Sequence, residues 1–294
     1  MADAPSIALL GTGIMGGAMA SRWAGAGFPL TVWNRDTAKA ERVAEHAAAG
    51  TAGGRMTVAG SPAEAVAAGD VVVTMLADGD VTASVMADAV GAARPGATWV
   101  QMATVGDEAT ARLAALAAGA GVGFVDAPVL GTKGPAEQGA LTVFASGPDD
   151  LHDVADTVFA PVATTVRWVG EVGAGSRLKL VVNAWLASLL AGLAEAIALA
   201  ERLDVDPRTF LDAIDGGPVG PPYARVKGDM MVARTYPPSF PLHLLTKDVD
   251  LVAEAAAAAG LDLRLPAAIR DLLVAAEEHH ADDDMAAVVE ALRR

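Results

Sequence analysis

The sequence predicts a parallel α/β unit followed by an all-helical unit, joined by one long helix. In the first half, short apolar strands alternate with alanine-rich helical segments. Strands that are apolar along their whole length are typical of a parallel sheet covered on both faces. In the second half only helical segments remain. We therefore expect two domains, residues 1–170 and 171–294, with the boundary in the glycine-rich segment 170–175.

The individual elements follow from the same pattern. Strands are expected at residues 6–10, 30–34, 71–76, 98–102, 123–126, 141–146 and 164–169. In the first half, helices are expected at 18–26 and 107–118. The long connecting helix is expected at 176–203, and further helices at 207–215, 224–232, 247–259 and 266–279.

The composition excludes several classes of protein. The chain has 294 residues, of which 53% are hydrophobic, and this is ample for a packed core. A net charge of −15 argues against a nucleic-acid surface, and the absence of cysteine excludes disulfide and thiolate chemistry. The longest apolar stretch, residues 180–194, is short for a membrane span, and the first five residues do not resemble a signal peptide. We expect a soluble, cytoplasmic protein without a membrane partner.

A glycine-rich motif follows the first predicted strand directly. Its GxGxxG spacing between a strand and a helix is the arrangement of a dinucleotide-binding turn. Gly11 would make the tight turn, Gly13 would let the backbone approach the pyrophosphate, and Gly16 would let helix and strand pack closely. The N–H groups at the helix start would face the diphosphate. The residues expected to contact the cofactor here are Gly11, Gly13, Ile14, Met15 and Gly16.

The end of the second strand favours NADP(H). An NAD-preferring site usually places a carboxylate about 20 residues after the glycines. This chain has Asn34 at that position, followed by Arg35. The Asn34 amide does not repel the 2′-phosphate of NADP(H), and the Arg35 guanidinium can bind it. Thr37 adds a hydroxyl donor. If Asp36 points at the ribose instead, the preference for NADP(H) weakens or reverses, so NAD(H) is kept as the alternative cofactor.

Two polar residues interrupt the long apolar helix. Lys179 and Asn183 are four residues apart and share one helix face, with Gly175 one turn earlier. A partly desolvated lysine can remove and return the proton of an alcohol during hydride transfer, and a neutral amide can orient the substrate oxygen. We expect Gly175 to leave room for the substrate or the nicotinamide. The alternative is that Lys179 extends from the helix end into solvent.

Taken together, these motifs resemble the β-hydroxyacid dehydrogenases, among them 3-hydroxyisobutyrate dehydrogenase, tartronate semialdehyde reductase and the glyoxylate/succinic semialdehyde reductases. The matching segments are Gly11-Thr12-Gly13-Ile14-Met15-Gly16, Asn34-Arg35, Asp126-Ala127-Pro128-Val129, Gly175 with Lys179 and Asn183, and Phe240 with Lys247-Asp248. The resemblance covers essentially the whole chain. It implies an N-terminal Rossmann domain, a long interdomain helix, an all-helical C-terminal domain and a homo-oligomer, either a dimer or a tetramer.

The resemblance also assigns residues. It implies that Lys179 is the catalytic lysine and Asn183 its partner. It adds cofactor contacts at Met75, Leu76, Thr104 and Lys247, and it places Phe240 and Asp248 at the border of the substrate.

One position departs from the family pattern. The family usually has a serine after Asp-Ala-Pro-Val, and its hydroxyl helps to hold the substrate carboxylate, whereas this chain has Leu130. Substrate binding in this turn then falls to backbone N–H groups near Gly131 and Thr132, or to the Thr132 hydroxyl. A bulkier or less polar substrate than a small hydroxy acid or aldehyde acid becomes an alternative.

Other functions are weighed against this one. The related imine reductases commonly carry Asp or Tyr in place of the lysine, so imine reduction ranks second, and a non-catalytic NADP-binding module ranks third.

No metal site is predicted, because His279 and His280 point to different faces of a helix, and the acidic run at 282–284 is interpreted as a solvated loop. Trp185, six residues after Lys179, is a candidate for lining the site.

Overall fold

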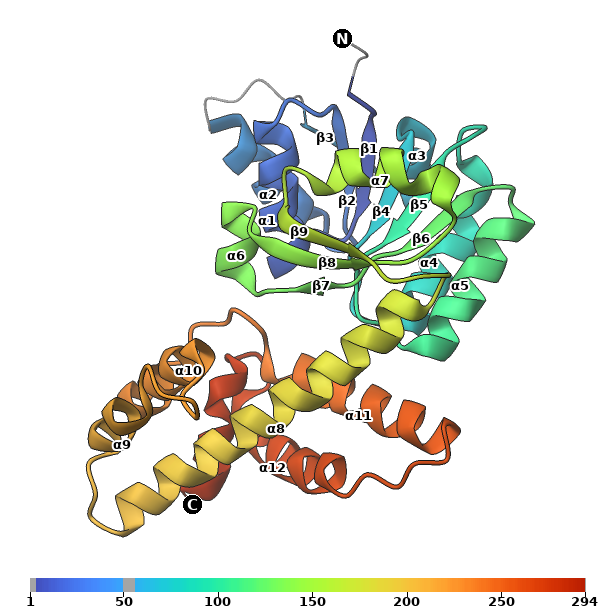
Figure 1. Ribbon diagram of the computed structural model, residues 1–294. Helices are drawn as coiled ribbons and strands as arrows, with labels where there is room; N and C mark the ends of the chain where they lie inside the picture. Colours follow the sequence, from blue (N-terminus) through green and yellow to red (C-terminus); the bar gives the residue numbers. More distant parts are fainter. Residues whose placement is uncertain (1–3, 50–55, 294) are drawn as a thin grey trace. The chain divides into compact units, whose positions relative to one another are not determined.

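The first unit of the chain is built on a six-stranded parallel sheet (Figure 1). The computed structural model describes residues 4–49 and 56–293. The strand order is β3-β2-β1-β4-β5-β6, so the order in which successive strands are added changes direction between β1 and β4, where Rossmann folds bind dinucleotides. The strands are β1 (Ile7–Leu10), β2 (Leu30–Trp33), β3 (Met56–Val58), β4 (Val71–Thr74), β5 (Thr98–Gln101) and β6 (Gly123–Asp126).

Helices cover both faces of this sheet, as expected (Figure 1). Along β1, Ile7 and Leu9 join one apolar core, and Ala8 and Leu10 join the other. The first core also contains side chains of α1 (Ile14–Gly25), α2 (Thr37–Ala49), α6 (Lys133–Gln138) and α7 (His152–Phe159). The second contains side chains of α3 (Pro62–Ala68), α4 (Gly79–Ala89) and α5 (Asp107–Gly119).

Two predicted strands lie outside this sheet, which corrects the expectation of a single parallel sheet. β8 (Leu141–Ala145) and β9 (Ala163–Trp168) form a separate three-stranded sheet with the short β7 (Val129–Leu130). β7 and β8 are antiparallel, and β8 and β9 are parallel. Only residues 131–140 join β7 to β8, fewer than the dozen or so that a parallel crossover needs. The very short β3 and β7 were not predicted.

The second unit is helical, as expected from the sequence. The chain divides into the compact units Met1–Lys179 and Leu180–Arg294, and α8 (Ala174–Arg202) starts in the first and continues in the second. The second unit contains α9 (Pro207–Ile214), α10 (Pro222–Ala233), α11 (Leu242–Ala258), α12 (Leu265–His280) and the 3-10 helix η3 (Met285–Leu292). α11 begins five residues before its expected start, because buried Leu242 and Leu245 extend its apolar face toward Pro241.

The long helix α8 is less buried than its composition predicts. It is long and apolar enough to cross a membrane by length and composition, and less than half of that apolar window is buried. Val181, Trp185 and Leu199 are exposed on it. Lys179 and Asn183, in contrast, are buried polar residues of the same helix, which is typical of a helix packed within protein.

Candidate functional site

The glycine turn after β1 has the geometry that its three glycines predict. Gly11 has a φ of +106°, and a Cβ there would lie 2.3 Å from the Met75 carbonyl oxygen. A Cβ on Gly16 would lie 2.0 Å from the Gly11 carbonyl oxygen, so helix and strand pack closely at this position. A Cβ on Gly13 would meet no atom within 4 Å, which leaves its backbone open to a ligand.

The same turn has unsatisfied polar groups that suit a phosphate. The Thr12 side chain is buried, and its Oγ1 has no hydrogen-bond partner among the described residues. Helix α1 begins at Ile14 without a side-chain cap, so the first-turn N–H groups of Ile14 and Met15 are not covered by a capping side chain. An open glycine, an orphaned hydroxyl and an uncapped helix start together fit the diphosphate of a dinucleotide. The sequence analysis did not identify Thr12 as a site residue.

Asn34 is hydrogen-bonded to the glycine turn. Its Oδ1 accepts a hydrogen bond from the Thr12 N–H at 3.2 Å, and its Nδ2 donates to the Asp36 carbonyl oxygen at 3.1 Å. The amide is therefore engaged with the protein backbone on both sides. The exposed residues that follow it are Arg35, Asp36 and Thr37, the last at the start of α2.

The ends of β4 and β5 place further predicted cofactor contacts in the first unit. Met75 and Leu76 follow β4 and lie against Gly11. After β5, Gln101 is fully buried, accepts from the Thr74 hydroxyl and donates to the Ala103 carbonyl oxygen at 3.1 Å. These bonds fix the segment that carries the half-buried Thr104.

The turn after β6 carries residues that the sequence assigns to the substrate. Leu130 is half-buried at the end of β7 and pairs with Thr142 of β8. Gly131 has a φ of +133°, and a Cβ there would lie 2.6 Å from a Leu141 methyl carbon, so a glycine is required. Thr132 precedes α6 and makes no side-chain capping bond.

Asp126, the last residue of β6, is fully buried and faces α8. Its carboxylate accepts from the Ser176 N–H at 2.8 Å and from the Ser176 hydroxyl at 2.7 Å. Burial raises the pKa of the Asp126 carboxyl, although the hydrogen bonds from Ser176 and Ser146 oppose that rise.

Gly175 is required for packing, and the expectation that it leaves room for a ligand is wrong. A Cβ at this position would lie 2.2 Å from the Phe144 carbonyl oxygen. The missing side chain lets the first turn of α8 approach the backbone of β8 closely.

Lys179 is buried, with 6% of its surface exposed, which rules out the alternative of a lysine in solvent. It lies on α8, three residues after Ser176 and about one turn before Asn183. A buried ionisable amine one turn from a buried amide is a candidate for proton transfer, because such groups cluster at functional sites.

In the second unit, Asn183, Lys247 and Asp248 form one polar cluster. Asn183 Nδ2 donates to Asp248 Oδ2 at 2.7 Å, and Lys247 Nζ lies 2.9 Å from Asp248 Oδ1. Asn183 is 1% exposed, and its Oδ1 has no hydrogen-bond partner among the described residues. Asn183 Oδ1 can therefore accept a hydrogen bond from an N–H or O–H group of a bound molecule. Asp248 thus contacts both Asn183 and Lys247, and its predicted place at the border of the substrate stays a prediction.

A buried ion pair holds the segment that carries Phe240. Lys227 Nζ lies 2.6 Å from Asp284 Oδ1, and Ser239 donates to Asp284 Oδ2 through its N–H at 3.1 Å and its hydroxyl at 2.6 Å. The Phe240 N–H also donates to this carboxylate, at 3.4 Å. Asp284 is fully buried, so its interpretation as part of a solvated loop is wrong. In residues 4–49 and 56–293, no three His, Asp or Glu side chains group as a metal site.

Comparison with known proteins supports the predicted family. Residues 6–170 match the family model of the NAD binding domain of 6-phosphogluconate dehydrogenase. Residues 173–292 match the model described as NAD-binding of NADP-dependent 3-hydroxyisobutyrate dehydrogenase. The chain is 32% identical to glyoxylate/succinic semialdehyde reductase 1 of Arabidopsis thaliana over 98% of both chains. The chain belongs to the β-hydroxyacid dehydrogenase family.

Solved structures agree with this assignment. A β-hydroxyacid dehydrogenase of Mycobacterium tuberculosis, 3-hydroxyisobutyrate dehydrogenase crystallised with L-serine, has a TM-score of 0.84 and 31% identity over 99% of both chains. A reductive aminase of Aspergillus terreus has a TM-score of 0.61 over 98% of this chain. Its identity is 22%, so this likeness shows the fold alone. As a member of the β-hydroxyacid dehydrogenase family, the chain is an NAD(P)-dependent oxidoreductase.

Proposed function

We propose that this protein transfers hydride between NADP(H) and a small hydroxy acid or aldehyde acid, with Lys179 as the general acid and base. The observation that carries the proposal is the burial of a lysine in an otherwise apolar helix, one turn before Asn183. A buried amine with an amide one turn later can exchange a proton with a bound hydroxyl or carbonyl group, which is the task of a general acid and base.

In this proposal each residue has one task. The nicotinamide cofactor, when bound, supplies the hydride acceptor or donor. Lys179 removes the hydroxyl proton during oxidation and returns it during reduction. Asn183, whose Nδ2 is engaged by Asp248, offers Oδ1 to a neighbouring donor. Thr12 and the first-turn N–H groups of α1 bind the diphosphate.

Arg35 supports NADP(H) over NAD(H). The Asn34 amide is engaged with the Thr12 N–H and the Asp36 carbonyl oxygen, and no carboxylate stands at its position. The exposed Arg35 guanidinium beside it suits a 2′-phosphate.

The substrate class is inferred from the relatives. Those named glyoxylate/succinic semialdehyde reductase and 3-hydroxyisobutyrate dehydrogenase act, by their names, on aldehyde acids and a hydroxy acid. Leu130 offers no side-chain hydrogen bond to a substrate carboxylate, so we infer weaker carboxylate binding in this turn.

A substrate panel tests the function. Short aldehyde acids, 3-hydroxy acids and cyclic imines are assayed by cofactor absorbance with NADP(H) and NAD(H) side by side. We expect turnover of an aldehyde acid or hydroxy acid, with a higher kcat/KM for the phosphorylated cofactor. Turnover of cyclic imines alone would favour imine reduction, which Leu130 keeps as the second candidate. NADPH binding without turnover of any compound would favour a non-catalytic module.

We also infer that the protein is a cytoplasmic homo-oligomer, at least a dimer, that pairs through α8. All large apolar side chains that are exposed in the described residues lie in the second unit. Val181 and Leu199 are 18 residues apart, which is five turns at 3.6 residues per turn, and Trp185 and Leu203 have the same spacing. They form one exposed stripe with Gly192 between them, where another helix can approach closely.

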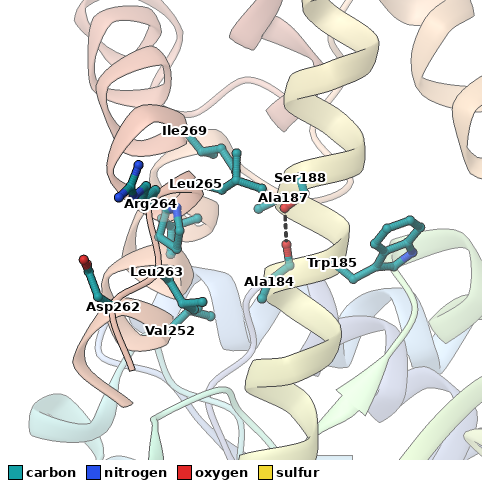
Figure 2. Close-up of a pocket in the computed structure, with 12 residues that line it drawn as sticks. Ala184, Trp185, Ala187, Ser188, Val252, Asp262, Leu263, Arg264, Leu265 and Ile269 are labelled. Atoms are coloured by element: carbon teal, nitrogen blue, oxygen red, sulfur yellow. Dashed lines mark hydrogen bonds between the residues drawn. The ribbon is translucent and has the colours of Figure 1, made fainter. Parts of the chain in front are cut away.

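Trp185 is the largest apolar side chain of this exposed stripe. It is 68% exposed and lines the rim of a cavity of about 380 Å³ that α8, α11 and α12 enclose. Figure 2 shows its ring pointing away from the side chains on the far side of that cavity, such as Leu263 and Ile269. An exposed tryptophan on an apolar stripe is typical of a protein interface.

The oligomeric state is measured by sedimentation. The wild-type protein is expected to sediment as a dimer or larger, and Trp185→Glu is expected to shift it toward the monomer. Val219→Glu, at an exposed apolar residue between α9 and α10, is the matched control and should leave the mass unchanged. A monomeric wild-type protein would contradict this inference.

A further inference from the structure

We propose that Asp126 is a positioning residue that clamps the first turn of α8 and thereby fixes Lys179. The proposal rests on the catalytic role of Lys179 proposed above. Asp126, Ser176 and Lys179 all belong to the first compact unit, so the clamp lies within one unit. None of the roles predicted from the sequence included it.

The contacts form a tertiary cap on the start of α8. The first N–H groups of a helix have no partner within the helix and need acceptors from elsewhere. In α8, the Gly175 N–H donates to Ser146 Oγ at 3.0 Å, and the Ser176 N–H donates to Asp126 Oδ2 at 2.8 Å. Ser146 Oγ in turn donates to Asp126 Oδ2 at 3.0 Å. The acceptors thus come from β6 and from the end of β8, far from α8 in sequence.

A second set of bonds continues the clamp toward α5. The Ser176 hydroxyl donates to Asp126 Oδ1 at 2.7 Å and lies 2.9 Å from the Thr110 hydroxyl. Asp126, Ser146 and Thr110 are fully buried, and Ser176 is nearly so. Because water does not reach these groups, each lost bond would leave a polar group unsatisfied, at a cost larger than that of a surface bond.

The backbone leaves this turn little freedom to move. Gly175 lies so close to β8 that a Cβ would meet the Phe144 carbonyl oxygen at 2.2 Å and the Asp126 carboxylate at 3.2 Å. The carboxylate side chain fills the gap beneath the helix start. Removing it would open a polar hole at the point where α8 meets β6 and β8.

Lys179 follows Ser176 by three residues, which is less than one turn of rigid helix. A shift of the first turn therefore moves the Lys179 Cα by a similar amount. Misplacing a reacting group by about 1 Å can reduce turnover by roughly 10²-fold. Asp126 acts through the helix and needs no contact with substrate or cofactor.

The experiment compares Asp126→Ala, Asp126→Asn and Asp70→Ala. Asparagine can keep the clamp, because its Oδ1 can accept from the Ser176 N–H while its Nδ2 donates to the Ser176 hydroxyl. Asp70 is the control for loss of an aspartate that binds a serine in the same way. It accepts the Ser6 N–H at 2.9 Å and the Ser6 hydroxyl at 2.6 Å, but its side chain is 51% exposed and it lies before the amino end of β4, whereas Asp126 is at the carboxyl end of β6.

Two readouts are taken, and one does not depend on activity. The first is kcat together with the KM and Kd for NADPH. The second is acylation of the native protein by acetic anhydride, quantified for each lysine by mass spectrometry. Lys133, whose side chain is 51% exposed, is the reactive reference. Buried Lys227 reports unfolding of the second unit, and near-UV circular dichroism from buried Trp23 and Trp99 reports unfolding of the first.

We expect Asp126→Ala to reduce kcat by roughly 10²-fold with little change in the Kd for NADPH. Acylation of Lys179 relative to Lys133 should change while Lys227 stays protected. Asp126→Asn should restore both readouts, and Asp70→Ala should leave both at wild-type values.

An Asp126→Ala protein with wild-type Lys179 acylation would overturn the proposal, whatever its activity. Loss of Lys227 protection to the same degree as Lys179 would also overturn it, because the effect would then be unfolding. If Lys179 proves dispensable for turnover but its acylation still depends on Asp126, the clamp stands and the proposed function fails.

Discussion

Lys179→Met is expected to reduce kcat by about 10²–10⁴-fold, the range typical of losing a general acid and base. Methionine has a similar length and tolerates burial, so the substitution removes the amine with little change in packing at a position that is 6% exposed. The Kd for NADPH should stay near its wild-type value, because the diphosphate is assigned to Thr12 and the first-turn N–H groups of α1 rather than to Lys179.

The measurement combines steady-state turnover of the best substrate of the panel with NADPH fluorescence titration. Lys133→Met, on the exposed side of α6, is the control and should retain full turnover. A Lys179→Met protein with wild-type kcat on every active substrate would remove the lysine from the mechanism. A variant that no longer binds NADPH would show that the residue serves binding rather than proton transfer.

The local patterns of the sequence were sufficient to predict most of the fold. β1 is apolar on both faces because both of its faces are covered, and Gly11 follows it because the turn needs a positive φ. The division into a parallel α/β unit and a helical unit was visible for the same reason. The separate sheet of β7, β8 and β9 was not predicted, because strand pairing depends on the length and path of the connections.

The candidate site was predicted where its residues stand out locally. Lys179 and Asn183 are anomalous in an apolar helix, and the glycine turn has a recognisable spacing. No role was predicted for Asp126, and Asp284 was wrongly interpreted as part of a solvated loop, because a carboxylate shows its role only through its partners. Asp126 meets Ser176 across 50 positions, and Asp284 meets Lys227 across 57. Long-range pairing of this kind leaves no periodic signal in one sequence.

The buried pair of Lys227 and Asp284 gives the second large effect that we expect. Lys227→Met should lower the free energy of unfolding by about 3–5 kcal/mol, because it leaves a carboxylate buried without its cation. Lys227 is 2% exposed and Asp284 is fully buried, so water cannot replace the missing partner. Chemical denaturation at pH 7 measures the loss. Arg225→Met is the control on the same helix, because its pairs with Asp212 and Asp229 are exposed to solvent and contribute little to stability.

The pH dependence of stability tests whether the unpaired charge of Asp284 causes the stability loss in Lys227→Met. Burial alone would raise the pKa of Asp284, but the Lys227 ammonium and the hydrogen bonds from Ser239 and Ala286 outweigh it, and the pKa is lowered. A lowered pKa gives stability that is present above the unfolded-state value and is lost as the pH falls through the folded-state value. Without Lys227, burial acts with less opposition, so the penalty of Lys227→Met should shrink as the pH is lowered toward 4 and Asp284 takes up a proton.

The double variant Lys227→Met with Asp284→Asn should recover part of the loss at pH 7, since no charge is then buried. An equal penalty at both pH values, with no recovery in the double variant, would mean that packing rather than charge holds Phe240 and the start of α11 in place.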